Sequence, residues 1–430
     1  MKQLGPGFWR LYASSATSNL ADGIGRTALP LLAAYYTRSP LLISGLASLA
    51  FLPWLFFALP SGALVDRVDR RYAMAAANAV RAVATAALGV LVLTHLANIV
   101  VLYTIAFALG VAETVYDSAT RAILAQVVTT DRLDSANGLL TVEETLGQSF
   151  LGATIGSALF AFAVSAPFLL NASGFTVAAV LILTLRGRFR PTRTAAKASV
   201  RADVVEGVRW LTRHRFLRGL TLVSAGSAFV QSMGTGVLVL YVLEILRLPA
   251  GDFGYVMVGA GIGSIIGGIA TPLLATRFGR GPLLVIGAVV SAVGVAGMGM
   301  TRNGYIAVIL FALSGGGVMV WNVLTMSLRQ ALIPQALFGR VQGAYRTVVW
   351  GAIPLGSLAG GLLANAFGLR TVFVAAGAGL LVMAGFLSVL VRTHRDQLDA
   401  EPVPHPDLGT VEDALAGATA PGSAGVAGQR

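Results

Sequence analysis

The sequence predicts an all-α membrane protein with twelve transmembrane helices in two pseudo-symmetric six-helix bundles. Three observations lead to this fold class. The 430 residues are 56% hydrophobic and 12% charged, whereas an ordinary soluble domain carries about 25% charged residues. The chain contains 51 glycines, which weaken helices in water but are common where helices pack inside bilayers. Finally, the apolar residues fall in twelve long stretches. The low charge excludes a soluble enzyme and a nucleic-acid-binding protein.

Each stretch is long enough to cross a bilayer. A spanning helix needs about 20 mostly apolar residues, because its backbone polar groups must be satisfied within the segment. The first six stretches run approximately over 11–36, 41–65, 72–93, 99–121, 137–163 and 166–185, and the second six over 219–244, 253–275, 282–301, 304–327, 341–366 and 371–391. The first stretch is not expected to be a cleaved signal peptide, since it is long and carries two charges.

The basic residues predict the orientation of the helices, since cytoplasmic loops are enriched in Lys and Arg. With the N-terminus inside, 25 of the 31 basic residues are cytoplasmic and two lie within spans. The outer loops hold only four, which are Arg38, Arg247, Arg302 and Arg370. The net charge of +12 is therefore an orientation signal. We expect a multi-pass protein of the cell membrane with both termini in the cytoplasm.

The main interior break in the apolar pattern lies at 186–218. We expect a bundle over 1–185, a cytoplasmic linker over 186–218, a second bundle over 219–395 and a disordered tail over 396–430. In the linker Val204, Val208 and Leu211 share a helical face and basic residues lie elsewhere. This pattern predicts an amphipathic helix at the inner membrane surface. The tail has acids, Pro, Gly and Ala without apolar periodicity, which indicates disorder.

The two halves of the sequence repeat each other. Three glycines spaced by five and four recur 204 residues later, and a pair of arginines recurs 210 residues later. The glycines are Gly147, Gly152 and Gly156, then Gly351, Gly356 and Gly360, and the arginines are Arg67 and Arg70, then Arg277 and Arg280. Both matches fall at corresponding positions between helices, which predicts a duplicated six-helix unit. Such duplication is typical of transporters whose two bundles rock around a central site.

The loop between the second and third spans reads GALVDRVDRR, from Gly62 to Arg71. It resembles the loop signature of the major facilitator superfamily, G-x-L-x-D-R-x-x-R-R. The fragments DSATRAILAQVV, LDSANGLL, ALIPQALFGRVQG and PLGSLAGGLL are similar to the exporter branch that includes enterobactin and macrolide efflux proteins. The resemblance covers roughly residues 8–395. One motif departs from the pattern. Many proton-driven exporters have G-P-x-x-G-G in the fifth helix, but this chain has no proline after Gly152.

The resemblance implies the major facilitator fold and a gating role for this loop. In the family the loop holds the outward-open state by binding the other half of the protein. Asp66 would pair with an arginine of the loop or with Arg121, and Gly62 would let two helices approach closely. We assign gating to the loop residues and to charges at nearby helix ends, namely Gly62, Asp66, Arg67, Arg70, Arg71, Asp117, Arg121, Arg277 and Arg280. The alternative is a basic loop that only obeys the positive-inside rule.

The first span carries a polar stripe. Ser15, Asn19, Asp22 and Arg26 are spaced by four, three and four residues, so they share one face of a helix. A charge near the midplane costs at least about 2.5–3.5 kcal/mol and usually faces a cavity or a partner. We expect the stripe to line a central cavity, with Asp22 and Arg26 able to neutralise each other. The alternative is an ion pair that only locks helices together.

The fourth span carries Glu113, Asp117 and Arg121 at intervals of four residues. Glu113 is the deeper acid, and burial disfavours the charged form of a carboxyl group. We therefore expect Glu113, or Asp22 on the first span, to carry the coupled proton. A structural hydrogen bond or salt bridge is the alternative role for Glu113.

Three further charges lie in or near spans of the first half. Glu143 and Glu144 begin the fifth span near the cytoplasm, where a solvated helix start is the expected role. Arg81 lies within the third span and is expected to pair with one of the acids.

The second half has polar stripes in place of buried acids. Ser, Gln and Thr residues share a face of the seventh span, and Ser, Asn and Thr residues share one on the tenth, beside Trp321. The resemblance implies that the first, fourth, seventh and tenth helices line the cavity. We therefore expect six residues to contact substrate, namely Asn19, Asp22, Arg26, Gln231, Trp321 and Asn322. Hydrogen bonding between helices is the alternative for each.

These features predict a secondary active exporter, most simply a proton antiporter. It would move amphipathic small organic molecules, such as drugs, siderophores or natural products, out of the cytoplasm by alternating access. A cavity with few charges suits a lipophilic or weakly cationic substrate. Proton-coupled uptake of a small organic solute by symport is the main alternative.

An enzyme or receptor is a more distant alternative. The sequence has no H-E-x-x-H, G-x-S-x-G or G-x-x-x-x-G-K-[ST] motif, so the common hydrolase and P-loop chemistries are not expected. It has no cysteine, which excludes disulfides and thiolate ligands. We expect no cofactor and no metal, and a monomer whose partners are its substrate, protons and the lipid bilayer.

Overall fold

The computed structural model describes residues 4–129, 132–187, 189–190 and 200–398. Within these residues every regular element is a helix, which confirms the predicted all-α class. The predicted tail lies outside the described residues except for 396–398, and so does the linker segment 191–199.

Helices of the first half coincide with the first six predicted spans. They are α1 (Pro6–Tyr36), α2 (Pro40–Val65), α3 (Arg70–Leu93), α4 (Ile99–Val127), a span made of α5 (Leu133–Thr145), the π-helix η2 (Leu146–Gly152) and α6 (Ala153–Phe162), and α7 (Ala166–Leu183). Prolines at the first positions of α1 and α2 suit helix starts, because proline lacks only an N–H that would be unpaired there.

Helices of the second half match the remaining spans. They are α9 (Arg215–Leu240) with η3 (Tyr241–Ile245), η4 (Ala250–Asp252) with α10 (Phe253–Phe278), α11 (Arg280–Met300), α12 (Gly304–Leu332), α13 (Gln335–Phe367) and α14 (Leu369–Thr393). α8 (Val200–Arg213) precedes them and α15 (Arg395–Leu398) follows. Because α9 begins at Arg215, the second bundle starts a few residues before the predicted boundary at 219.

Corresponding helices of the two halves begin alike. Asn98 accepts hydrogen bonds from two backbone N–H groups at the start of α4, and Asn303 does the same at the start of α12. These asparagines satisfy donors that a helix cannot satisfy itself. Eleven helices in the described part of the chain are long and apolar enough to cross a membrane, and α1 is the long helix outside that set.

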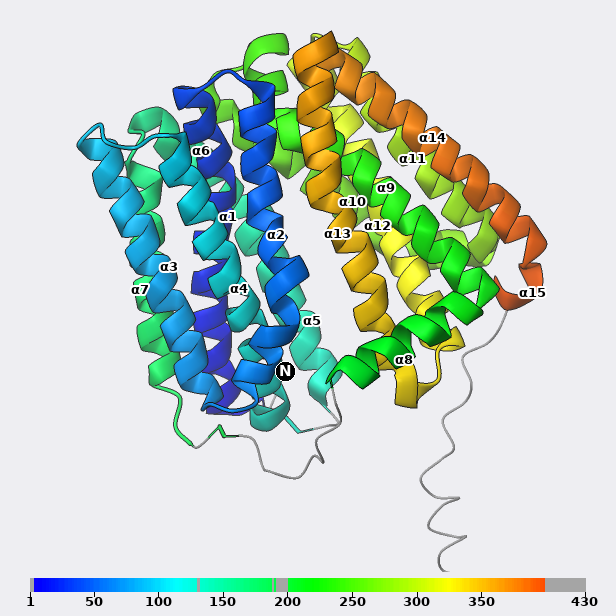
Figure 1. The fold of residues 1–430 in the computed structure, drawn as a ribbon, viewed down its shortest axis with the longest axis horizontal. Coiled ribbons are helices and arrows are strands. Elements are labelled where there is room, and N and C mark those ends of the chain that lie inside the picture. Colours follow the sequence, from blue (N-terminus) through cyan, green and yellow to red (C-terminus); the bar gives the residue numbers. More distant parts are fainter. Residues whose placement is uncertain (1–3, 130–131, 188, 191–199, 399–430) are drawn as a thin grey trace, which may run out of the picture.

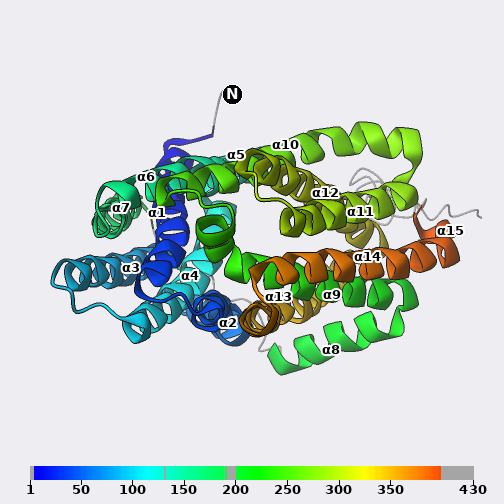
Figure 2. The ribbon, with the colours of Figure 1, turned by 90° about the horizontal axis from the view of Figure 1, so that it is seen from above.

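The two halves form separate groups of helices (Figure 1). From above, two seams join them: α2 lies against α13, and α6 lies against α10 (Figure 2). In the first seam Ser48 donates a hydrogen bond to the carbonyl oxygen of Pro354 at 2.7 Å, and the rings of Trp54 and Trp350 meet edge to face with centroids 4.9 Å apart.

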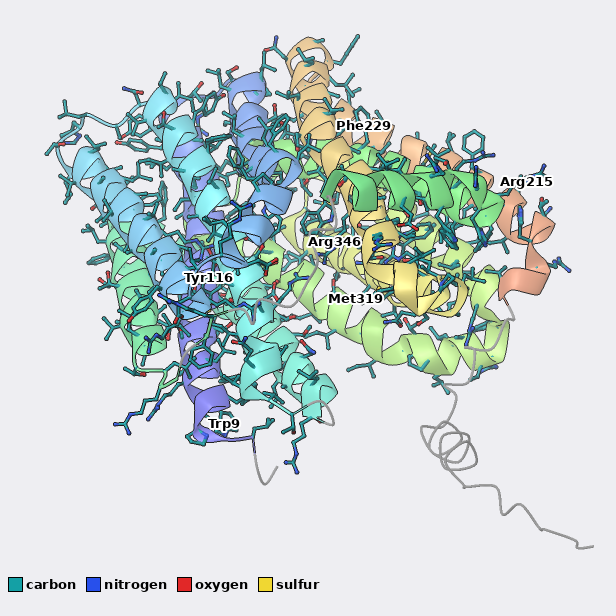
Figure 3. All side chains as sticks on the ribbon, turned by 60° about the horizontal axis from the view of Figure 1, so that its bottom comes forward. Trp9, Tyr116, Arg215, Phe229, Met319 and Arg346 are labelled. Carbon is teal, nitrogen blue, oxygen red and sulfur yellow. The ribbon has the colours of Figure 1, made fainter. Side chains whose placement is uncertain are left out.

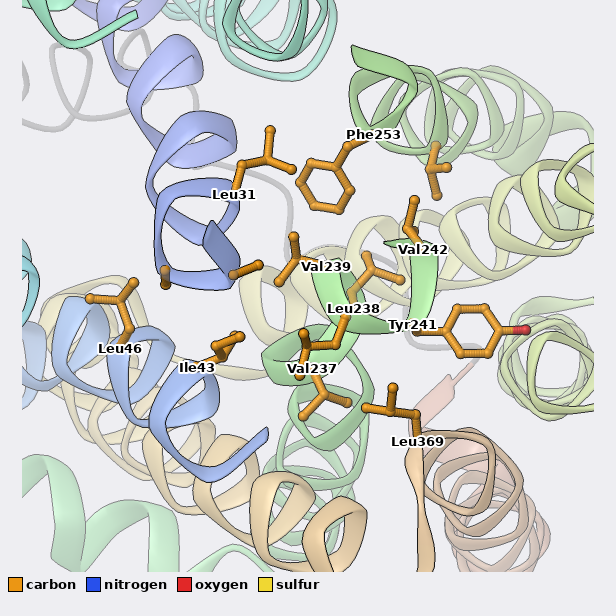
Figure 4. Close-up of a cluster of buried hydrophobic side chains, with 14 of the residues drawn as sticks. Leu31, Ile43, Leu46, Val237, Leu238, Val239, Tyr241, Val242, Phe253 and Leu369 are labelled. Carbon is orange, nitrogen blue, oxygen red and sulfur yellow. The ribbon is translucent and has the colours of Figure 1, made fainter. Parts of the chain in front are cut away.

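Among the described residues, the halves share a hydrophobic core at one end only. This shared core combines Leu31 and Ile43 of the first half with Leu238 and Phe253 of the second (Figure 4). At the opposite end, one core contains only residues of the first half, such as Phe8, and another contains only residues of the second half. The molecule is therefore closed where α1 ends and split where α1 begins.

Glycines make the predicted repeat visible in the packing. An added Cβ at Gly152 or Gly156 would collide with the backbone of α1, and one at Gly356 or Gly360 would collide with the backbone of α9. Only glycine lets helices approach this closely. The fifth span lacks the expected proline and instead contains η2, and π-helical turns are frequent at functional sites.

The linker helix α8 packs on the second half. Gly207 lies directly against the backbone of Arg340 on α13, the Glu206 carboxylate pairs with the Arg340 guanidinium, and Leu211 is buried. Val208, predicted to lie on the apolar face, is 44% exposed. The side chain of Val204 is outside the described set. One face of α8 thus packs against α13, and apolar side chains of α8 next to that face, such as Val208, are exposed.

Candidate functional site

A cavity of about 380 Å³ lies between the halves beneath the shared core. Leu238, Val239 and Phe253 belong to both the shared core and the cavity wall, so the core closes the cavity at one end. Trp54 and Phe311 face it from the two halves. Most of the wall is apolar, and its charges come from α1 and α4. A pocket of this kind suits an apolar molecule oriented by a few polar groups.

Four charged side chains from three helices meet at this wall. Arg81 Nη2 on α3 lies 2.9 Å from Asp22 Oδ1 on α1 and 4.0 Å from Glu113 Oε2 on α4. Glu113 Oε1 in turn lies 2.6 Å from Arg26 Nη2 on α1. We call this row, Arg26–Glu113–Arg81–Asp22, the charge cluster. Its formal charges cancel, but only Asp22, Arg26 and Glu113 line the cavity, and Arg81 lies buried behind them.

Arg81 anchors the charge cluster. Its side chain is 1% exposed, and Nη1 donates to Ser18 Oγ at 3.2 Å. The guanidinium lies 4.7 Å from the ring centre of Phe175 and 5.2 Å from that of Tyr116. Aromatic faces attract cations, most strongly when water is excluded. Arg81 is therefore a structural element of the first bundle, paired with the mostly buried Asp22.

Arg26 and Glu113 form the accessible part of the charge cluster. Their side chains are 55% and 22% exposed, and both line the central cavity. Asp22 and Arg26 were expected to neutralise each other, but each pairs with a residue of another helix. Arg26 pairs with Glu113 of α4, and Asp22 pairs with Arg81 of α3. A change in the charge of Glu113 would act directly on a residue of the cavity wall.

Asn19, expected to contact substrate, lies in an adjoining polar pocket of about 310 Å³ within the first half. Asp22 and Glu113 line both spaces. Asn19 Nδ2 donates to Glu143 Oε1 at 3.0 Å, and Gln148 Nε2 donates to Asn19 Oδ1 at 2.8 Å. Glu143, expected to be solvated, is 5% exposed, because the start of the fifth span packs against α1. Its neighbour Glu144 is exposed as expected.

The polar stripes of the second half surround a different space. Gln231, Trp321 and Asn322 line a pocket of about 210 Å³ inside the second bundle, with Ser224 and Tyr345. None of the three lines the 380 Å³ cavity. Thr235 is the member of the α9 stripe that does. The structure therefore divides the six predicted substrate residues among three pockets.

The loop signature lies at the split end and binds its own half. Asp66 Oδ1 lies 3.6 Å from Arg70 Nη2, and Arg71 Nη1 donates to the carbonyl oxygen of Leu185 at 2.7 Å. Asp69 caps α3 by accepting a hydrogen bond from the backbone of Arg71. Gly62 has open space where a side chain would be, so the close helix approach expected there is not made in this conformation.

The remaining predicted gate residues are spread over both halves. Asp117 Oδ2 pairs with Arg121 Nη2 at 2.8 Å on α4. Arg67 and Arg277 are exposed, and Arg280 borders a pocket between α11 and α14. Viewed with the split end turned forward, Tyr116 lies in the first half and Arg346 lies in the second half (Figure 3). Arg346 stacks on Trp350, with 5.0 Å to the ring centre.

Sequence reasoning missed two features of the site. It predicted that Arg81 pairs with an acid, as the contact with Asp22 confirms, but it did not place Arg81 between Asp22 and Glu113. It also missed the contact between Trp54 and Trp350, which joins the halves at the cavity. Two tryptophans near the middle of apolar spans carry no signal of mutual contact in a single sequence.

Proteins of known family and structure resemble this chain along most of its length. Residues 6–420 match the model of the transmembrane secretion effectors. The multidrug efflux pump Tap of Mycolicibacterium fortuitum is 25% identical over 407 residues, which is 93% of this chain and 98% of that protein. The MFS-type transporter YfiS of Bacillus subtilis (strain 168) is 25% identical over 395 residues, 89% of this chain and 93% of its own length.

Solved structures share the fold. The nucleoside transporter NupG has a TM-score of 0.74 at 11% identity, over 90% of this chain and 100% of that one. A bacterial homologue of the human lysosomal transporter Spinster, in an inward-facing and occupied conformation, has a TM-score of 0.72 at 14% identity, over 92% and 98% of the two chains.

Proposed function

Because this chain belongs to the transmembrane secretion effector family of the major facilitator superfamily, we propose that it exports amphipathic small organic molecules in exchange for protons. The central cavity carries this proposal. It is apolar and aromatic over most of its wall, and its charged lining residues, Asp22, Arg26 and Glu113, belong to the charge cluster. An amphipathic molecule can place its rings against Trp54 and Phe311 and its polar end beside Arg26 and Glu113.

Export rather than uptake is favoured by the apolar wall and by the relatives. Nucleosides and peptides, which the names of NupG and of the peptide transporters of this fold specify, carry many hydrogen-bonding groups that need polar partners. Tap, in contrast, is described as a multidrug efflux pump. Uptake by symport remains the second candidate, because solved structures of this fold include those transporters.

We assign the split end to the cytoplasm, following the basic residues of the loops. The conformation is then inward-facing: the shared core blocks the outer end, and Arg70 and Arg71 of the loop bond within the first half. Rocking the bundles about the two seams would open the shared core and close the split end. Both termini then lie in the cytoplasm, the protein lies in the cell membrane, and a monomer suffices because one chain encloses the cavity.

The pair between Arg26 and Glu113 is our proposed link between protons and substrate. A proton on Glu113 removes the charge that holds Arg26, so Arg26 becomes free to move or to meet a substrate. Asp22 is the less suitable carrier, because the buried Arg81 holds it in place.

Transport by reconstituted protein tests the proposal. Vesicles with an acidic lumen should accumulate radiolabelled ethidium, and nigericin, which collapses the pH gradient, should abolish the accumulation. Glu113→Gln should lower it at least about tenfold, equivalent to 1.4 kcal/mol of lost driving force, while ethidium exchange without a gradient persists. Accumulation indifferent to the gradient would contradict antiport, and accumulation only from an acidic exterior would indicate symport.

A further inference from the structure

We propose that Glu143, which is neutral in this conformation, is a second proton-binding residue at a site distinct from the charge cluster. The inference rests on the proposed proton antiport and adds a second proton to each cycle. Glu143 would carry its proton from the outside and release it towards the cytoplasm.

Glu143 is buried without a cation. The residue is 5% exposed. Its Oε1 accepts a hydrogen bond from Asn19, and its Oε2 is buried with no hydrogen-bond partner. Among the described residues no arginine, lysine or histidine forms an ion pair with it. An ionised carboxylate is strongly unfavourable in such a place, because neither a cation nor water compensates its charge. A neutral carboxyl group keeps the Oε1 bond and carries its proton on Oε2.

The neighbouring charges do not supply the missing cation. The elements packed against α5 are α1, α4 and η2. Arg26 on α1 pairs with Glu113, and Arg121 on α4 pairs with Asp117. η2 contains no titratable residue. The polar groups that act on Glu143 are Ser15, Asn19 and the acid Glu144, and a second acid nearby further disfavours an ionised Glu143.

A polar pocket offers the proton a route. Asn19, which bonds Glu143, and Glu144, the next residue in the chain, line the 310 Å³ pocket together with Gln148, Asp22 and Glu113. This space is large enough for several water molecules. On release, the O–H bond at Oε2 breaks, the proton passes to a water of the pocket, and the carboxylate remains on Glu143.

One helix contacts both proton sites. α1 reaches Glu143 through Asn19 and forms half of the charge cluster through Asp22 and Arg26. Directly after Asp22, Gly23 packs against the backbone of η2. A shift of α1 against this π-helix, as the bundles rock, would break the bond between Asn19 and Glu143 and open Oε2 to the pocket. The two sites would thus load and unload together.

Glu143→Gln and Glu206→Gln form a matched pair of variants. Glutamine imitates the neutral carboxyl group and keeps an oxygen for Asn19, so E143Q should fold. Glu206 is an exposed glutamate of α8 that lines neither the central cavity nor the polar pocket, so E206Q is the control. In vesicles, the ethidium gradient that balances an imposed pH gradient gives the number of protons per ethidium. We expect E143Q to lower that number by one and E206Q to leave it unchanged.

Infrared spectra of the protein in vesicles provide the second measurement. Wild type, E206Q and E113Q should show a carboxylic-acid carbonyl band at neutral pH that E143Q lacks. An unchanged proton count together with an unchanged band in E143Q would overturn the inference. If wild type does not couple ethidium to protons but E143Q still loses the band, the proposed function fails while Glu143 stands as a proton-binding residue. If E143Q does not fold, Glu143→Asp should retain the band, and its loss there would also overturn the inference.

Discussion

At the scale of single residues, the charge cluster combines a rigid pair with an accessible one. Arg81 and Asp22 are buried and supported by aromatic rings, whereas Arg26 and Glu113 face the cavity. Buried pairs are costly to form and still more costly to break, because the remaining charge has no partner. The buried pair therefore fixes α1 against α3, and the accessible pair is left to respond to protons and substrate.

Removing one member of the buried pair should destabilise the first bundle. Arg81→Leu would leave Asp22 without its cation, at a cost of about 3–5 kcal/mol. Thermal unfolding in detergent should therefore occur at a clearly lower temperature than in wild type. Replacing both partners, Arg81→Leu with Asp22→Leu, should recover much of the loss. An unchanged unfolding temperature in the single variant would show that the pair has no structural role.

The residues of the charge cluster could be predicted from the sequence, as could a pair between Arg81 and an acid, but the partner of each residue could not. Asp22, Arg26 and Glu113 were identifiable as charges inside apolar spans. Which acid meets which arginine depends on the rotation of α1 against α3 and α4, and spacing within one helix does not report it. Glu143 was misjudged for the same reason: a position near a helix start suggests solvent, but α1 covers it.

At the scale of helices, the contact between the fifth span and α1 in the first half is equivalent to the contact between α13 and α9 in the second half. Glycines permit both approaches. The repeat at an interval of 204 residues predicted this equivalence, because small residues at a helix interface leave a pattern in the sequence. The π-helix η2 leaves no comparable pattern, since it arises from how α5 and α6 are held against α1.

Two glycines of α13 give a direct test of the helix contact. Gly360→Ala would place a methyl group against the backbone of Met233, whereas Gly343→Ala on the same helix meets nothing within 4 Å. We expect the first to cost about 1–3 kcal/mol and the second to be neutral or slightly stabilising. Thermal unfolding of both variants measures this. Equal behaviour of the two would contradict the close approach of α13 and α9.

At the scale of the whole molecule, the shared core at one end and the separate cores at the other define one conformation of a transporter that alternates between two. The twelve spans and the division into halves followed from the sequence, because bilayers demand long apolar helices. The conformation could not be predicted from the sequence, since the sequence of a protein that alternates between two states encodes the contacts of both.

The absence of cysteine from the sequence makes distances between introduced labels easy to measure. Arg38 and Glu244 face each other across the halves at the closed end, 3.9 Å apart, and Tyr72 and Thr276 are exposed residues of opposite halves at the split end. On addition of protons or ethidium, electron–electron distance measurements should show the first pair separating and the second approaching. Movement of both pairs in the same direction would exclude rocking.

Proton movement driven by substrate tests the central claim most directly, because coupling between two ligands is reciprocal. Vesicles loaded with ethidium, containing the pH dye pyranine and starting without a pH gradient, should acidify inside when they are diluted into ethidium-free buffer. Each ethidium that leaves would bring protons in, and Glu113→Gln should abolish the acidification. Alkalinisation of the lumen would identify symport, and a constant lumenal pH during ethidium efflux would contradict proton-coupled export.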